Sequence, residues 1–220
     1  MVFTISLFAL SVVLFILLMI VSFLLYKKRN DQDFDLKNSF PFELNYQSEF
    51  KENFYTHIFI ALYILACCGF YATFHMIYNN GYLIFIMVGG VLSCLAIYAL
   101  FYVPLLRLRL HIIVDAIFFS LRLAVSVAII VVSYRLIQIN VSWANITSIV
   151  LAGISTLATV VIIANPRLTL NFKTLEVEKE NGEKEHVRPK YVTLAFSEWL
   201  LIFLNIFNIL NIVILVIAMK

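Results

Sequence analysis

The sequence predicts an all-α integral membrane protein: a six-transmembrane-helix bundle with a small cytoplasmic β-hairpin between helices five and six. The first observation is composition, because 63% of the 220 residues are hydrophobic and 13% are charged. Soluble domains have about 45–50% apolar and about 25% charged residues. A soluble domain of this size cannot bury so much apolar surface, and a disordered chain requires the opposite composition. The other two observations are six long apolar runs and a one-sided distribution of basic residues.

The six apolar runs define the transmembrane helices of a single polytopic domain, residues 1–220. At about 1.5 Å of rise per residue, about 20 apolar residues cross the hydrocarbon core of a bilayer. The first run is longer than the apolar part of a signal peptide, and its basic cluster follows it, which favours a retained helix. The expected helices cover about residues 2–26, 57–78, 82–106, 110–137, 143–165 and 193–219.

Basic residues indicate the orientation of the bundle. The loops after helices one, three and five hold 13 of the 16 Lys and Arg residues. By the positive-inside rule these loops are cytoplasmic, so both termini are predicted to be extracytoplasmic in a multi-pass protein of the cell membrane. The net charge of +3 then reflects topology, and we expect the lipid bilayer as a partner and no nucleic acid. The 13 residues are Lys27, Lys28, Arg29, Lys37, Lys51, Arg107, Arg109, Arg167, Lys173, Lys179, Lys184, Arg188 and Lys190.

The loop at residues 27–56 mixes charges of both signs with aromatic residues, and Pro41 argues against one continuous helix. We expect this loop to lie along the cytoplasmic membrane face with its aromatic rings at headgroup depth. Two alternatives remain open, a solvated linker and a docking surface for a membrane-protein partner. The aromatic residues are Phe34, Phe40, Phe42, Tyr46, Phe50, Phe54 and Tyr55.

The loop at residues 166–192 has a different pattern, in which apolar and polar residues alternate before Asn181-Gly182. This dipeptide between alternating segments favours a β-hairpin. With a two-residue turn at the dipeptide, Lys179 faces Lys184, which is an unfavourable like-charge pair. The loop is also a second surface through which a membrane-protein partner is expected to dock.

Helix four carries its polar residues in one narrow stripe. At 100° per residue they fall within about 60° of one another. Lipid cannot satisfy such a stripe, so we expect it to face other helices or a watery cavity. The stripe consists of His111, Asp115, Arg122, Ser126 and Ser133.

Helix six offers partners for this stripe at matching depths. Counted from the cytoplasmic side, Asp115 and Glu198 each lie about five residues into their helix. Arg122 and Asn205 each lie about twelve residues in, with Asn208 beyond them. We therefore expect helices four and six to face each other, with Arg122 meeting asparagine carbonyls at mid-depth. These five residues form either a site for a polar ligand or for proton movement, or polar contacts that fix helix packing.

Small residues recur at helical spacing in helix three, where Gly89 precedes Ser93 and Gly90 precedes Cys94. Small residues four positions apart let neighbouring backbones approach closely. Similar small residues recur in helices two and five, so the sequence predicts a compact bundle.

No hydrolase motif, nucleotide-binding loop, dinucleotide-binding motif or Cys-x-x-Cys pair is present, so no cofactor and no metal are expected. The leading expectation is a non-enzymatic membrane component, either a small transport or translocation subunit or an accessory protein of a membrane complex. The alternative is an intramembrane enzyme that acts on a lipid or lipid-linked substrate at the cytoplasmic face. Its catalytic candidates are His111, Asp115 and Glu198.

Overall fold

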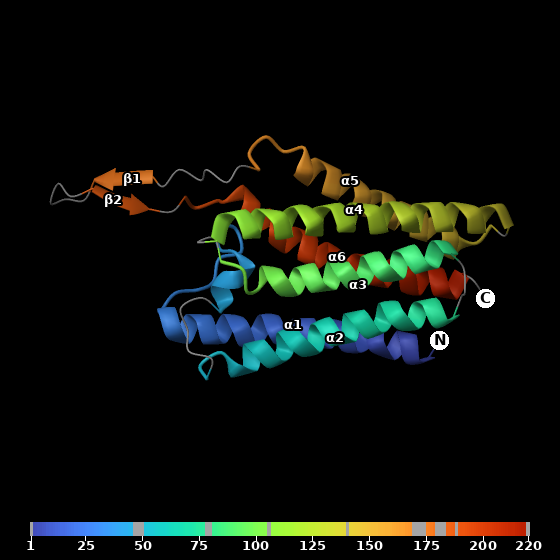
Figure 1. Ribbon diagram of the computed structural model, residues 1–220, viewed down its shortest axis with the longest axis horizontal. Helices are drawn as coiled ribbons and strands as arrows, with labels where there is room; N and C mark the ends of the chain where they lie inside the picture. The colour runs from blue at the N-terminus through green and yellow to red at the C-terminus, as the bar shows by residue number, and fades with distance from the viewer. Residues whose placement is uncertain are drawn as a thin grey trace.

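Among the residues that the computed structural model describes, six α-helices run along the long axis of the molecule (Figure 1). The described residues are 2–45, 51–77, 81–104, 107–139, 141–168, 175–178, 184–187 and 189–218. All six are long and apolar enough to cross a membrane, so the chain is a multi-pass membrane protein, and the six expected spans are confirmed. The helices are α1 (Val2–Asn30), α2 (Phe54–Ile77), α3 (Gly81–Leu100), α4 (Leu108–Ile139), α5 (Trp143–Ile163) and α6 (Thr193–Ala218).

Two helix ends differ from the expected boundaries for local reasons. Helix α1 continues about one turn further and ends where Asp31 adopts a left-handed conformation with φ of 53°, which is a common way to end a helix. Helix α3 ends at Leu100, before the expected position near 106. Pro104 follows, and proline disfavours helical conformation at the residue before it and cannot donate a backbone hydrogen bond.

Helix α6 is the central element of the bundle. Consecutive helices pack side by side, and α6 additionally contacts α1, α2 and α4. Its span is 56% buried within the protein, the largest share of the six. The polar residues of α6 therefore face protein on most sides, as the polar stripe of α4 requires.

The segment between α1 and α2 corrects one expectation. Residues Pro41–Leu44 form a 3-10 helix (η1), and the rings of Phe40 and Phe42 are buried in the bundle. The Trp199 indole nitrogen of α6 donates to the Ser39 carbonyl at 2.8 Å and anchors this segment. The expected position along the membrane face, with rings at headgroup depth, is wrong for these two residues because the end of the bundle buries their apolar surface.

Other residues of the same loop are placed differently. Phe54 and Tyr55 are 44% and 62% exposed at the start of α2. Tyr46 and Phe50 lie outside the described residues.

Two short strands, β1 (Leu175–Glu178) and β2 (Lys184–Val187), pair antiparallel and project from one end of the bundle (Figure 1). We call this end the β1–β2 end. Glu178 lies opposite Lys184, so the register expected from a two-residue turn is wrong by one residue. In the observed register Glu178, and not Lys179, is the partner of Lys184. The expected turn at Asn181-Gly182 lies outside the described residues.

Helix α3 packs closely on both sides, as its small residues predict. A Cβ atom on Gly90 would lie 2.3 Å from the buried ring of Tyr71 in α2. A Cβ atom on Gly89 would lie 2.9 Å from Val125 in α4. Both glycines are therefore required for α3 to fit between α2 and α4.

We predict that Gly90→Ala destabilises the protein by about 1–3 kcal/mol, because the added methyl group overpacks the α2–α3 contact. Thermal unfolding in detergent micelles measures this change. The matched control is Gly153→Ala in α5, where an added Cβ has no neighbour within 4 Å and helix propensity improves. Equal melting temperatures for the two variants would contradict the predicted packing.

Candidate functional site

Three of the predicted polar residues meet near the β1–β2 end of the bundle. His111 and Asp115 are one helical turn apart on α4, which places them on one face. Glu198 reaches them from the first turns of α6. The His111 Nε2 atom lies 3.0 Å from Glu198 Oε1 and 3.6 Å from Asp115 Oδ2. The sequence predicts these residues individually, and the structure joins them into one cluster.

Hydrogen bonding fixes the orientation of the His111 ring. Its Nδ1 atom lies 2.8 Å from the carbonyl oxygen of Val103, which only accepts, so Nδ1 carries a proton and donates. Nε2 then faces Glu198, and one proton lies between the two groups. Either the Glu198 carboxylic acid donates to a neutral imidazole or an imidazolium donates to the carboxylate. The proton can therefore move between the two groups without movement of either side chain.

The carboxyl groups of the cluster are not fully satisfied. Both oxygens of Asp115, and Oε2 of Glu198, have no hydrogen-bond donor among the described residues. Asp115 is 6% exposed and Glu198 is fully buried. A buried acceptor without a donor costs about 1–3 kcal/mol, and more if it is charged. Structural packing alone gives no reason to keep three such atoms together.

Aromatic rings from the α1–α2 segment cover the cluster. Phe40 and Phe42 both contact the His111 ring edge-on, with ring centroids 5.7 Å away. They exclude water on this side and strengthen electrostatic interactions among the buried groups. Sequence reasoning did not assign these rings to the site. The available signal was the Phe-Pro-Phe sequence at residues 40–42, which is too apolar for a solvated linker.

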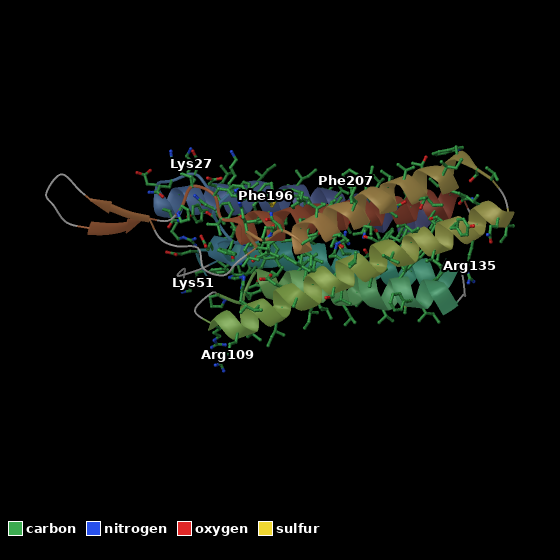
Figure 2. The ribbon with its side chains drawn as sticks, turned by 90° about the horizontal axis from the view of Figure 1, so that it is seen from above. Lys27, Lys51, Arg109, Arg135, Phe196 and Phe207 are labelled. Carbon is green, nitrogen blue, oxygen red and sulfur yellow. The ribbon has the colours of Figure 1, made fainter. Side chains whose placement is uncertain are left out.

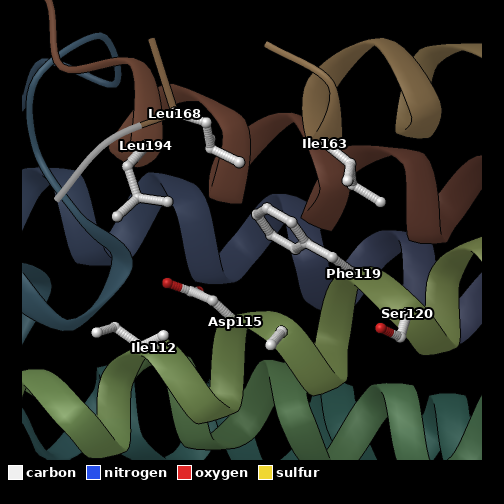
Figure 3. Close-up of a pocket in the computed structure, with 8 residues that line it drawn as sticks. Ile112, Asp115, Phe119, Ser120, Ile163, Leu168 and Leu194 are labelled. Carbon is white, nitrogen blue, oxygen red and sulfur yellow. The ribbon is translucent and has the colours of Figure 1, made fainter. Parts of the chain in front are cut away.

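A cavity of about 300 Å³ lies beside Asp115, between α4, the end of α5 and the start of α6. Figure 3 shows the Asp115 carboxyl group pointing into the space between α4 and the side chains of Leu168 and Leu194. Ala116, Ser120 and Ile163 line the cavity and are exposed, so it opens on the outer surface of the bundle. The lining residues are Ile112, Asp115, Ala116, Phe119, Ser120, Ile163, Leu168 and Leu194.

The cavity lies near the end of a membrane span. Asp115 is the eighth residue of the 32 in α4, which is about 10 Å from the start of the helix at about 1.5 Å per residue. A helix of this length exceeds the hydrocarbon core by about 18 Å. The cavity is therefore within reach of both lipid chains and headgroups.

Arg122 lies deeper in the bundle and makes the predicted contact with α6. It donates to the Asn205 Oδ1 atom at 3.1 Å and to the Leu204 carbonyl at 2.7 Å. With the Asn208 amide oriented by its hydrogen bonds, its oxygen accepts from both terminal guanidinium nitrogens at 2.9 Å. Both terminal nitrogens of the guanidinium are therefore bonded to acceptors of α6, whereas Nε has no partner among the described residues.

Beyond Arg122, hydroxyl groups connect α4 with α5. Ser126 lies 3.1 Å from Ser155, and Ser133 lies 2.8 Å from Ser148. Asn211 of α6 donates to the carbonyl oxygen of Ser148. Because these groups are paired with one another, they act as contacts that hold three helices together.

Among the described residues, only His111, Asp115 and Glu198 form a group of three that could hold a metal ion, with one ligand atom of each within 4.8 Å of the others. The arrangement can therefore do two things. It can exchange protons with a molecule in the cavity, and it can offer one nitrogen and two oxygen ligands to a cation.

We predict that Arg122→Ala destabilises the protein by about 1–3 kcal/mol, because the buried Asn205 oxygen loses its donor and the Leu204 and Asn208 oxygens each lose the bonds from the guanidinium. The melting temperature in detergent measures this change. Arg109→Ala, which removes an exposed arginine from the same helix, serves as the control and is expected to melt like the unchanged protein. If both variants melt alike, Arg122 does not hold α4 against α6.

Comparisons with family models, with curated proteins and with solved structures found no match for this chain. A functional assignment therefore has to come from the chemistry of the buried cluster and the cavity next to it.

Proposed function

We propose that this multi-pass membrane protein is an intramembrane enzyme that acts on the polar end of a lipid or another amphiphile. One observation carries the proposal. The Asp115 carboxyl group, which has no hydrogen-bond donor among the described residues, lines an apolar cavity that opens on the membrane-spanning surface. The paired His111 and Glu198 lie directly behind it.

The cavity suits the apolar part of such a substrate. Its volume is at the lower end of the range for ligand pockets, about 300–1,000 Å³, and its lining is mostly aliphatic and aromatic. An acyl or prenyl chain would bury apolar surface against Phe119, Leu168 and Leu194. The polar end of the molecule would then lie against Asp115. This one contact would both bind the substrate and orient its polar end toward the carboxyl group.

The three polar residues then have distinct roles. Asp115 is the group that meets the substrate and acts as general acid or base. His111 and Glu198 share a proton and supply or accept it through the 3.6 Å contact between His111 and Asp115. Phe40 and Phe42 keep water away from the pair, so protons pass mainly between the protein and the substrate.

The enzyme proposal ranks before the transport component that the sequence favoured, because the mid-membrane polar groups are paired with one another. A small transport or translocation subunit is the second candidate. It is supported by the polar groups that continue from the cluster past Arg122 to Ser133 and Ser148, as a path for protons or small cations requires.

We predict that the protein, reconstituted in vesicles of the total lipid extract of its expression host, changes the amount of at least one lipid species. Asp115→Asn, Glu198→Gln and His111→Gln are expected to reduce this change at least tenfold, because each removes a proton-transfer group. Mass spectrometry of the extracted lipids measures it. A pH-sensitive dye inside the same vesicles reports proton flux, so flux without lipid turnover would favour the transport candidate.

Two further variants separate the cavity from the cluster. Ala116→Phe is expected to fill the cavity and reduce lipid turnover while leaving the cluster in place. Ile117→Phe, at an adjacent position that is 49% exposed and outside the cavity lining, is the matched control and should retain turnover. Absence of any lipid change in the unaltered protein, or equal turnover in both Phe variants, would overturn the proposal.

We also propose an orientation in the cell membrane, with both termini extracytoplasmic and the β1–β2 hairpin in the cytoplasm. The distribution of basic residues supports it. Figure 2 shows Lys27, Lys51 and Arg109 at the β1–β2 end of the bundle and Arg135 at the opposite end. Docking of a membrane-protein partner through the cytoplasmic segments in 27–56 and 166–192 stays a proposal, and residues 39–44 contribute little to it because most are buried in the bundle.

Cysteine labelling tests this orientation. In intact cells, a membrane-impermeant maleimide is expected to label Arg135→Cys, whereas Arg109→Cys is labelled only after permeabilisation. Both positions are exposed and lie at opposite ends of α4. The unaltered chain controls for its own three free cysteines. The reverse labelling pattern would show that the bundle has the opposite orientation.

A further inference from the structure

We propose that His111, Asp115 and Glu198 bind one divalent transition-metal ion, for which Zn²⁺ is the best match. The inference deepens the proposed function and rests on it for the role of the ion, although metal binding itself can be measured without any substrate. No sequence pattern predicts this metal site, because His111 and Glu198 lie 87 positions apart on two different helices and the ligands match no known spacing motif.

The distances in the cluster are close to those of a metal site. Bond lengths of about 2.0–2.2 Å to zinc place two ligands of a tetrahedral ion roughly 3.4 Å apart. His111 Nε2 lies 3.0 Å from Glu198 Oε1 and 3.6 Å from Asp115 Oδ2. The two distances from His111 therefore differ from this value by only a few tenths of an ångström, and all three ligand atoms lie within 4.8 Å of one another, so a side-chain rotation can bring them around a cation.

The His111 ring has the orientation that metal-binding histidines adopt. Such a histidine coordinates through one nitrogen and donates the proton of the other to a carbonyl or carboxylate. His111 donates from Nδ1 to the Val103 carbonyl at 2.8 Å. Nε2 therefore faces the two carboxyl groups, and its lone pair is available once the proton shared with Glu198 is released.

The unsatisfied oxygens provide an independent reason for a cation. Two carboxyl groups are brought together at 0% and 6% exposure, and three of their four oxygens have no hydrogen-bond donor among the described residues. Two carboxylates this close repel each other in a medium of low dielectric constant. A divalent cation cancels both charges and supplies the missing partner for the oxygens.

The set of ligands selects the class of metal. One imidazole nitrogen with two carboxylates suits Zn²⁺, Mn²⁺ or Fe²⁺, whereas Ca²⁺ and Mg²⁺ prefer all-oxygen sites and Cu⁺ prefers sulfur. Three protein ligands leave at least one position for another molecule, as in catalytic zinc sites. Because Asp115 also lines the cavity, that position faces the place proposed for the polar end of the amphiphile.

The test uses the full-length protein in detergent, stripped with a chelator and then equilibrated with Zn²⁺ or Co²⁺. We expect about one equivalent of bound Zn²⁺ by elemental analysis, and a Co²⁺ spectrum typical of mixed nitrogen and oxygen ligation. Zn²⁺ should also raise the melting temperature. Asp115→Asn and Glu198→Gln should each weaken binding at least tenfold, because they remove a charged ligand.

The matched control is His57→Gln, which removes a histidine that contacts the Tyr102 hydroxyl outside the cluster and should leave metal binding unchanged. Circular dichroism confirms that each variant is folded, and His111→Gln replaces any variant that is not. Substoichiometric binding to the unaltered protein, or equal binding by the folded cluster variants, would overturn the metal site. Lipid turnover that persists after stripping overturns the role of the ion in turnover, whereas metal binding without turnover overturns only the proposed enzyme.

Discussion

A guanidinium group inside a bilayer needs acceptors from the protein, and the Arg122 group is fully buried in a membrane-spanning helix. Helix α6 supplies those acceptors, which fixes the rotation of α4 about its own axis. Asp115 precedes Arg122 by seven residues, and Glu198 precedes Asn205 by seven. Both helices start at the β1–β2 end, and seven residues are about two helical turns. Asp115 and Glu198 therefore lie at the same depth in the bundle. The contact at mid-depth therefore determines that the carboxyl groups meet.

The polar groups of the bundle differ in how fully they are hydrogen-bonded. This difference distinguishes the groups that hold the helices together from the cluster at the β1–β2 end. Around Arg122 and the serines of α4 and α5, most donors and acceptors are paired, with Arg122 Nε and Asn211 Oδ1 as exceptions, so these groups specify how the helices pack. At the β1–β2 end, acceptors outnumber donors and a cavity lies next to them. Phe40 and Phe42 isolate that end from water. The polar contacts in the middle of the bundle thus hold α4 and α6 in the arrangement that brings the buried carboxyl groups together.

Much of the fold follows from the sequence because hydropathy and charge act over whole helices. The six spans, the facing of α4 and α6, and the Arg122 contact could be predicted from run length, depth and the polar stripe. The burial of Phe40 and Phe42 could not, because an aromatic ring has similar propensities for an interface and for a protein interior. The strand register could not be predicted, because the dipeptide Asn181-Gly182 does not by itself determine the length of the turn. The cavity could not be predicted either, because it lies between the first turns of α4, the end of α5 and the start of α6. Its presence depends on how these three helices pack and not on any local sequence pattern.

The early end of α3 has a consequence for acid–base chemistry. Pro104 ends the helix within a few residues of Leu100, so the carbonyl of Val103 falls outside the helical hydrogen-bond ladder and accepts from His111. If α3 continued for another turn, a backbone N–H further along would occupy that carbonyl. The imidazole would then be free to carry its proton on the nitrogen that faces Glu198. A residue without any polar side-chain atom therefore selects the tautomer of the histidine, and with it the direction in which the buried proton can travel.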